Sequence, residues 1–133
     1  MDLDRTPAQI SSAMAEEARA LNHRTLKPDA FPNPSNVADT AVGIATVVQR
    51  LPQALQQLEA GLQALYDDKR IRLADRHPRE VSASDIHHAV CDALFGLEEA
   101  RRALAGVEGH LRSATSVLGN LGAPWEDEGE AGG

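Results

Sequence analysis

The feature that most constrains the fold is a run of apolar residues that alternates steps of four and three between residues 37 and 65. The series is Val37, Ala41, Ile44, Val48, Leu51, Leu55, Leu58, Leu62 and Leu65. This spacing places the side chains on one face of an α-helix and is typical of helices that pair along a seam. We therefore expect one long helix over about residues 36–66.

Pro52 lies inside this predicted helix. Proline lacks the backbone N–H, and its ring clashes with the carbonyl four residues earlier, which together cost about 3 kcal/mol or more. A chain that left the helix at Leu51 and began a new one would have no reason to keep the phase of the apolar series, yet the phase is kept. A single helix kinked near Val48–Pro52 is therefore favoured over two separate helices.

A second series with the same spacing predicts a partner helix over about residues 83–121. It comprises Ile86, Val90, Ala93, Leu97, Ala100, Leu104, Val107, Leu111, Ala114, Leu118 and Leu121. The helix is expected to start at Ser82 or Ser84, with Asp85 in its first turn, where a carboxylate interacts favourably with the helix dipole. Because a short connection joins two long apolar seams, we expect an antiparallel helical hairpin.

Pairing the two seams end to end places Val37 near Leu121 and Pro52 opposite Gly106. Glycine costs about 1 kcal/mol relative to alanine inside a helix. We therefore expect Gly106 to relieve crowding beside the kink. The positions expected to hold the hairpin together are Pro52, Gly106, Leu51, Leu55, Leu58, Leu104 and Leu111.

A shorter helix is predicted at the N-terminus, over about residues 7–23. Thr6 is a suitable N-cap, followed by Pro7 and by Gln9 at the position that completes a capping box. We expect this helix to pack beside the small residues Val47, Ala54 and Gly61 of the second helix. The predicted fold is thus an all-α three-helix bundle.

The bundle is expected to form a single domain over residues 1–122, followed by an acidic, Gly-rich tail at 123–133 that we expect to be disordered. Trp125, the only tryptophan, lies in this tail. It either packs back onto the bundle or is a docking residue for a partner.

Composition excludes several classes of protein. The chain is 42% hydrophobic but only 3% aromatic, which favours a core of packed aliphatic helices. A net charge of −7 argues against general binding to nucleic acid or to an anionic membrane. The single cysteine excludes an intramolecular disulfide. With no apolar run long enough to span a membrane and no signal peptide, we expect a soluble cytoplasmic protein.

One segment contains potential metal ligands, the stretch SDIHHAVCD at residues 84–92. His87 and Cys91 are four residues apart, and Asp85, His88 and Asp92 form a second row on the helix. The phase of the apolar series places them away from the seam, and no second helix supplies further ligands. An exposed polar start of the helix is therefore favoured over a metal site.

No catalytic arrangement is found. The sequence has no Gly-rich phosphate loop, no G-x-S-x-G, and no inward-facing Glu-x-x-His of a di-iron bundle. We therefore expect a protein that is not an enzyme, with no catalytic residue, metal, cofactor or small-molecule substrate.

Basic residues are concentrated between the two long helices, in a segment that we call the basic linker (residues 69–79). It holds Lys69, Arg70, Arg72, Arg76 and Arg79, five of the 13 basic residues of the chain. Such a patch can contact a phosphate backbone or an acidic partner. The alternative, which we favour, is a solvated turn whose charges suit the C-terminal end of the second helix.

Several segments resemble a family of short, uncharacterised, all-helical actinobacterial proteins. The matching segments are ARALNHRTL (residues 18–26), PSNV, and VVQRLPQALQQLEAGL, which fit the patterns ALNHxT and RLPQxLxQL within residues 8–121. The resemblance implies an all-α accessory protein, such as one encoded on a mobile or variable genome region. It implies no activity, cofactor or site.

These observations predict a non-enzymatic helical interaction module that acts as an adaptor, regulator or assembly subunit. Its partner is expected to be another protein or a second copy of the chain, with Trp125 as a further candidate contact. The alternative is an accessory protein that touches nucleic acid through the basic linker.

Overall fold

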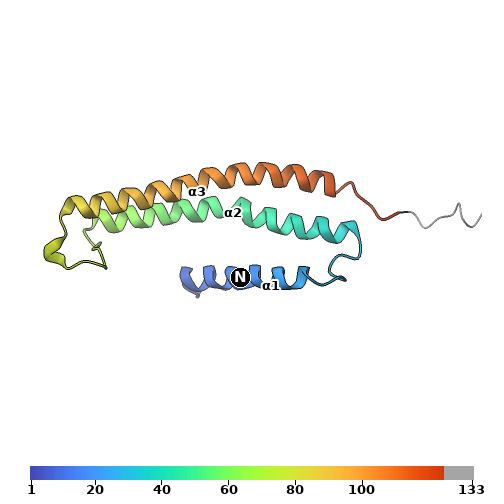
Figure 1. The fold of residues 1–133 in the computed structure, drawn as a ribbon, viewed down its shortest axis with the longest axis horizontal. Helices are drawn as coiled ribbons and strands as arrows, with labels where there is room; N and C mark the ends of the chain where they lie inside the picture. The colour runs from blue at the N-terminus through green and yellow to red at the C-terminus, as the bar shows by residue number, and fades with distance from the viewer. Residues whose placement is uncertain (125–133) are drawn as a thin grey trace, which may run out of the picture. The chain divides into compact units, whose positions relative to one another are not determined.

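The protein is all α-helical in a computed structural model that describes residues 1–124 (Figure 1). Three α-helices and one short 3-10 helix follow one another along the chain, with no strand in this range. They are α1 (Pro7–Thr25), α2 (Pro34–Asp67), η1 (Pro78–Glu80) and α3 (Ala83–Leu118). The predicted fold class and all three predicted helices are confirmed.

Two compact units can be distinguished. One contains Met1–Asp39 and the described residues from Leu118 onward, and the other, the hairpin unit, contains Thr40–Val117. The expected packing of α1 beside Val47, Ala54 and Gly61 concerns the arrangement of these two units and stays a prediction, as does a single domain over residues 1–122.

The start of α1 follows from its sequence. The backbone N–H of Gln9 donates to Thr6 Oγ1 at 3.2 Å, and the N–H of Thr6 donates to Gln9 Oε1 at 2.8 Å. This reciprocal capping box satisfies two of the N–H groups that a helix start leaves without partners. The helix ends at Thr25, with His23 and Arg24 in the last turn, where positive charge suits the helix dipole.

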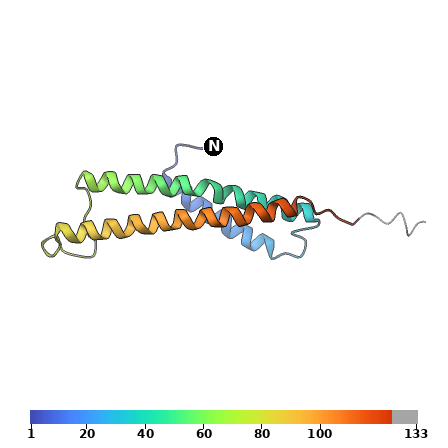
Figure 2. The same ribbon diagram turned by 90° about the horizontal axis from the view of Figure 1, so that it is seen from above.

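Helix α2 is continuous through Pro52. Figures 1 and 2 show its axis changing direction near the middle, where the proline removes one hydrogen bond of the helix. The predicted single, kinked helix is therefore confirmed.

Helices α2 and α3 form an antiparallel hairpin, and the half-buried side chains along them define its seam (Figures 1 and 2). One row on each helix is as predicted: Val48, Leu55 and Leu62 on α2, and Leu97, Leu104 and Leu111 on α3. The second row on each helix is displaced by one residue from the prediction. It comprises Ala45, Pro52, Glu59 and Tyr66 on α2, and Leu94, Arg101, Glu108 and Thr115 on α3.

The expectation that Leu58 belongs to the seam is wrong, because its side chain is 54% exposed. Leu51 is half-buried, whereas Ile44 and Leu65 are also exposed. The apolar surface of α2 is wider than one facing helix can cover. On each helix, therefore, one of the two predicted rows of apolar residues is half-buried in the seam, and the other lies beside the seam.

The register of the hairpin is marked by one ion pair between the two helices. Arg101 Nε donates to Glu59 Oε2 at 2.6 Å, and Arg101 Nη2 donates to Glu59 Oε1 at 3.2 Å. The predicted pairing of Val37 with Leu121 puts Glu59 level with Glu99, which is within one helical turn of Arg101. The predicted register is therefore close to the observed one.

Two further expectations about the hairpin are wrong. Helix α3 ends at Leu118, so Leu121 lies outside it, in a turn in which the N–H of Leu121 donates to the carbonyl of Leu118 at 3.1 Å. Gly106 does not relieve crowding, since it is exposed and a Cβ built there would meet no atom of the described residues within 4 Å beyond the backbone of its own helix.

None of the helices within residues 1–124 combines the length and the apolar character needed to cross a membrane.

The open space at Gly106 leads to a stability prediction. Gly106→Ala should raise the free energy of unfolding by about 1 kcal/mol, because alanine restricts the unfolded chain and favours the helix. The measurement is urea unfolding followed by circular dichroism. Ala103→Gly, at an exposed position one turn earlier, is the reciprocal control and should lower stability by a similar amount. A loss of stability in Gly106→Ala would show that this position is crowded.

Candidate functional site

The two long helices give the hairpin unit two different sides, one on each flank of the seam. The first, which we call the polar side, carries Gln49, Gln56 and Gln63 of α2 and Glu98 and Arg112 of α3. Two exposed apolar side chains, Val42 and Phe95, also lie on it. Residues of both helices line shallow depressions along it. The helical rows on the other flank of the seam therefore share the opposite side.

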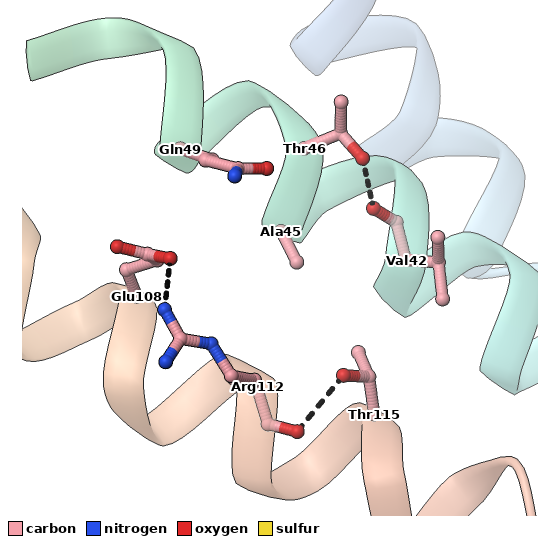
Figure 3. Close-up of a pocket in the computed structure, with 7 residues that line it drawn as sticks. All are labelled: Val42, Ala45, Thr46, Gln49, Glu108, Arg112 and Thr115. Atoms are coloured by element: carbon pink, nitrogen blue, oxygen red, sulfur yellow. Dashed lines mark hydrogen bonds and ion pairs between the residues drawn. The ribbon is translucent and has the colours of Figure 1, made fainter.

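The depression shown in Figure 3 illustrates how the polar side is satisfied. Arg112 pairs with Glu108 one turn earlier, and Thr46 Oγ1 donates to the carbonyl of Val42 at 2.8 Å. Thr115 Oγ1 likewise donates to the carbonyl of Arg112 at 3.0 Å. These polar groups bond within their own helices rather than across the depression.

The opposite side of the hairpin is apolar along its length, and we call it the apolar face. It is formed by Ile44, Leu51, Leu58 and Leu65 of α2 and by Ala93, Ala100, Val107 and Ala114 of α3. Ile44, Leu58, Leu65 and Val107 are 41%, 54%, 43% and 44% exposed. The remaining members are exposed too, except for Leu51, which is half-buried. No residue of this face carries a charge.

Charges lie instead inside the seam, at the Glu59–Arg101 pair. The side chains are 17% and 32% exposed, so the pair is partly shielded from water. The hydrogen bonds that Arg101 donates to the Glu59 carboxylate raise the pKa of Arg101. Sequence analysis missed this pair because it followed only apolar residues. The sequence contained the information needed to find the pair, since the predicted register already brings Glu59 and Arg101 within one helical turn of each other.

Several of the potential metal ligands contact other side chains or cap the start of α3. Tyr66 Oη lies 3.0 Å from His87 Nδ1, and His87 Nε2 lies 3.5 Å from Cys91 Sγ. Asp85 Oδ2 accepts from the N–H of Ser82 at 2.9 Å, which closes a capping box at the start of α3. Within residues 1–124, no group of three or more His, Cys, Asp or Glu side chains is placed to hold a metal ion.

The basic linker leaves α2 through a sharp turn. Lys69 has a φ of 57°, the left-handed conformation usual after a helix end. The N–H of Arg70 donates to the carbonyl of Leu65 at 2.9 Å, and that of Lys69 to Tyr66 at 3.0 Å, which is a Schellman motif. Further along, Ile71 and Leu73 are half-buried, so the linker has apolar anchors.

The basic side chains of the linker point to solvent. All five (Lys69, Arg70, Arg72, Arg76 and Arg79) are exposed, and none forms an ion pair with another residue of the described range 1–124. Their charge is therefore available to an anionic partner. Trp125, the other predicted contact residue, lies outside the described residues.

The chain matches no protein-family model, no curated protein and no solved structure. The features of the chain that bear on function are therefore the apolar face and the basic linker themselves.

The cap at Asp85 leads to a pH prediction. Hydrogen bonds from the backbone and the side chain of Ser82 lower the pKa of Asp85 from 3.8, with a smaller contribution from the charge of Arg76. A carboxyl whose pKa is lowered on folding stabilises the protein above its unfolded pKa, and this stability is lost as the pH falls through the folded value. Asp85→Ala should therefore be less stable than wild type at pH 7.

The difference in stability should shrink below about pH 3.8. The measurement is the unfolding midpoint in urea at a series of pH values. Ser84→Ala, in the same turn, is the control and should show no such pH-dependent difference. An Asp85→Ala deficit that persists unchanged in acid would contradict the role of the charged cap.

Proposed function

We propose that this chain is a non-enzymatic helical protein-interaction module, and that the apolar face is the surface to which a partner packs. The observation that carries the proposal is the length of this face: exposed apolar residues run from Ile44 to Leu65 along α2 and from Ala93 to Ala114 along α3. Large contiguous apolar patches are uncommon on monomeric soluble proteins and mark interaction surfaces.

The chemistry of the face fits a helical partner. A groove between two helices with apolar residues repeating every three or four positions accepts the apolar side of a third helix. Because the face carries no charge, docking there desolvates no ionised side chain. Such a surface suits an adaptor, a regulator or an assembly subunit of the cytoplasm, in keeping with the accessory role that the family resemblance implies.

The experiment is affinity capture of the tagged full chain from its native host, followed by mass spectrometry. Leu58→Asp places a charge on the apolar face and should abolish capture of the specific partner. The matched control is Gln56→Asp, which adds the same charge to the polar side of the same helix and should leave capture intact. Partners that are retained equally by both variants would contradict the proposal.

A second candidate function rests on the basic linker. Because its five basic side chains are exposed and free of ion pairs within residues 1–124, they favour contact with phosphate groups of a nucleic acid. The net charge of −7 opposes such contact, which makes this the weaker candidate.

The test is titration of a fluorescent DNA duplex with the full chain at several salt concentrations. Arg72→Gln/Arg76→Gln should lower the slope of log affinity against log salt by about two, one for each lost phosphate contact. The control, Arg19→Gln/Arg102→Gln, removes the same charge elsewhere and should leave the slope unchanged. Absence of binding at low salt would exclude this function.

A further inference from the structure

We propose that the occupant of the apolar face is the same face of a second copy of this chain, which gives a symmetric dimer with a four-helix core. This inference rests on the proposed function, because it names the partner of the surface assigned there. It follows from three features: the small amount of surface that the chain buries, the composition of the apolar face, and the antiparallel directions of α2 and α3.

The chain buries too little surface for a protein of its size. Within residues 1–124 Val90 is the only side chain that is buried, and the accessible surface of the whole chain is 10665 Å². A compact monomer of 14.2 kDa exposes about 6,800 Å². The excess is about 3,900 Å² by this comparison.

Most of this excess lies within the described residues. Even at the full surface of an extended chain, residues 125–133 would account for only about 1,300 Å². The remainder, about 2,600 Å², is roughly three times the 800 Å² or so that each partner buries in a stable interface of standard size. The missing burial is therefore on the scale of an obligate dimer.

The third helix of the chain offers too few side chains to supply it. Along its stripe α1 carries three large apolar residues, Ile10, Met14 and Leu21. The apolar face carries more on α2 alone and is two helices wide. A second copy, in contrast, presents a face of the same length and the same width.

The face is also complementary to itself. Its α2 row is bulky, with one isoleucine and three leucines, whereas its α3 row is small, with three alanines and one valine. When a two-fold axis runs parallel to the hairpin, the α2 row of each copy lies over the α3 row of the other. Bulky side chains then meet small ones, as interdigitated helix packing requires.

This arrangement also gives a favourable order of helices. Since α2 and α3 are antiparallel within a chain, α2 of one copy is antiparallel to α3 of the other as well. Every neighbouring pair in the four-helix core is then antiparallel, which is the arrangement of up-and-down bundles. An isologous contact of this kind is closed and does not continue into a filament.

The first test is the mass of the full chain by light scattering and sedimentation velocity, from low to high micromolar concentration. We expect about 28 kDa, twice the mass of one chain. Ala100→Lys puts a charge on the apolar face and should give a monomer of unchanged helicity, because Ala100 is exposed within the hairpin. Ala105→Lys, at an exposed position of the same helix on the polar side, is the matched control and should remain a dimer.

Three outcomes would overturn the proposal. One is a wild-type monomer at every concentration. Another is an Ala100→Lys protein that stays dimeric like the control, because the dimer would then use a different surface. The third concerns hydrogen exchange in α1 (Pro7–Thr25), measured on Ala100→Lys and on wild type diluted until it is monomeric. Faster exchange in Ala100→Lys would assign the apolar face to α1.

A second test decides the case if Ala100→Lys fails to fold. Leu58→Cys and Ala100→Cys are made separately in a Cys91→Ser background, so that each chain carries one thiol. Oxidation of a mixture should give several-fold more covalent dimer than oxidation of either variant alone. Preferential cross-linking of Leu58→Cys with itself would contradict the geometry, since bulky rows would then face each other.

Failure of this proposal can be distinguished from failure of the proposed function. A monomeric wild type that captures a partner in a Leu58-dependent manner overturns the dimer and keeps the interaction module. A monomeric wild type with no such partner overturns both.

Discussion

Two helices that pack along one seam can each cover only about two rows of residues on the other, and the structure of this hairpin follows from that limit. Apolar residues occupy a wider stripe on α2 than one neighbour can bury. When Leu55 and Leu62 turn toward α3, Leu58 and Leu65 must lie beside the seam. The same geometry brings Glu59 into the seam, where it meets Arg101.

The partly shielded ion pair gives the hairpin a property that its leucines cannot supply. A seam of leucines alone tolerates a shift of the two helices by one heptad, because each register buries a similar set of side chains. Separating Arg101 from Glu59 in a shifted register would leave two partly buried charges without partners, which is costly. The pair therefore favours one alignment of α2 and α3.

The sequence was sufficient to predict the three helices, the capping of α1, the continuity of α2 through Pro52 and the approximate register. These features depend on spacing and on local chemistry, which a single chain contains. The rotation of each helix about its own axis was not predictable in the same way. A stripe of three apolar rows supports two choices of seam, and the choice depends on cross-helix contacts such as Glu59–Arg101.

The position of Gly106 was misjudged for a related reason, since spacing alone does not show whether a glycine faces a neighbour or open space. The exposure of the basic linker agrees with the solvated turn that the sequence favoured. The sequence did not show whether its arginines, which follow Asp67 and Asp68, would pair with these neighbouring acids. The half-buried anchors Ile71 and Leu73 fix the backbone path, and the arginines between and after them extend into solvent.

The turn at Lys69 brings two demands into conflict. Its left-handed backbone, with φ at 57°, is the conformation that glycine adopts freely and that any residue with a Cβ adopts at a cost of about 1 kcal/mol or more. Glycine there would relax the backbone and remove a cation from the start of the linker. At this one residue the chain carries a surface charge at the expense of stability, because the strained backbone lowers the free energy of unfolding.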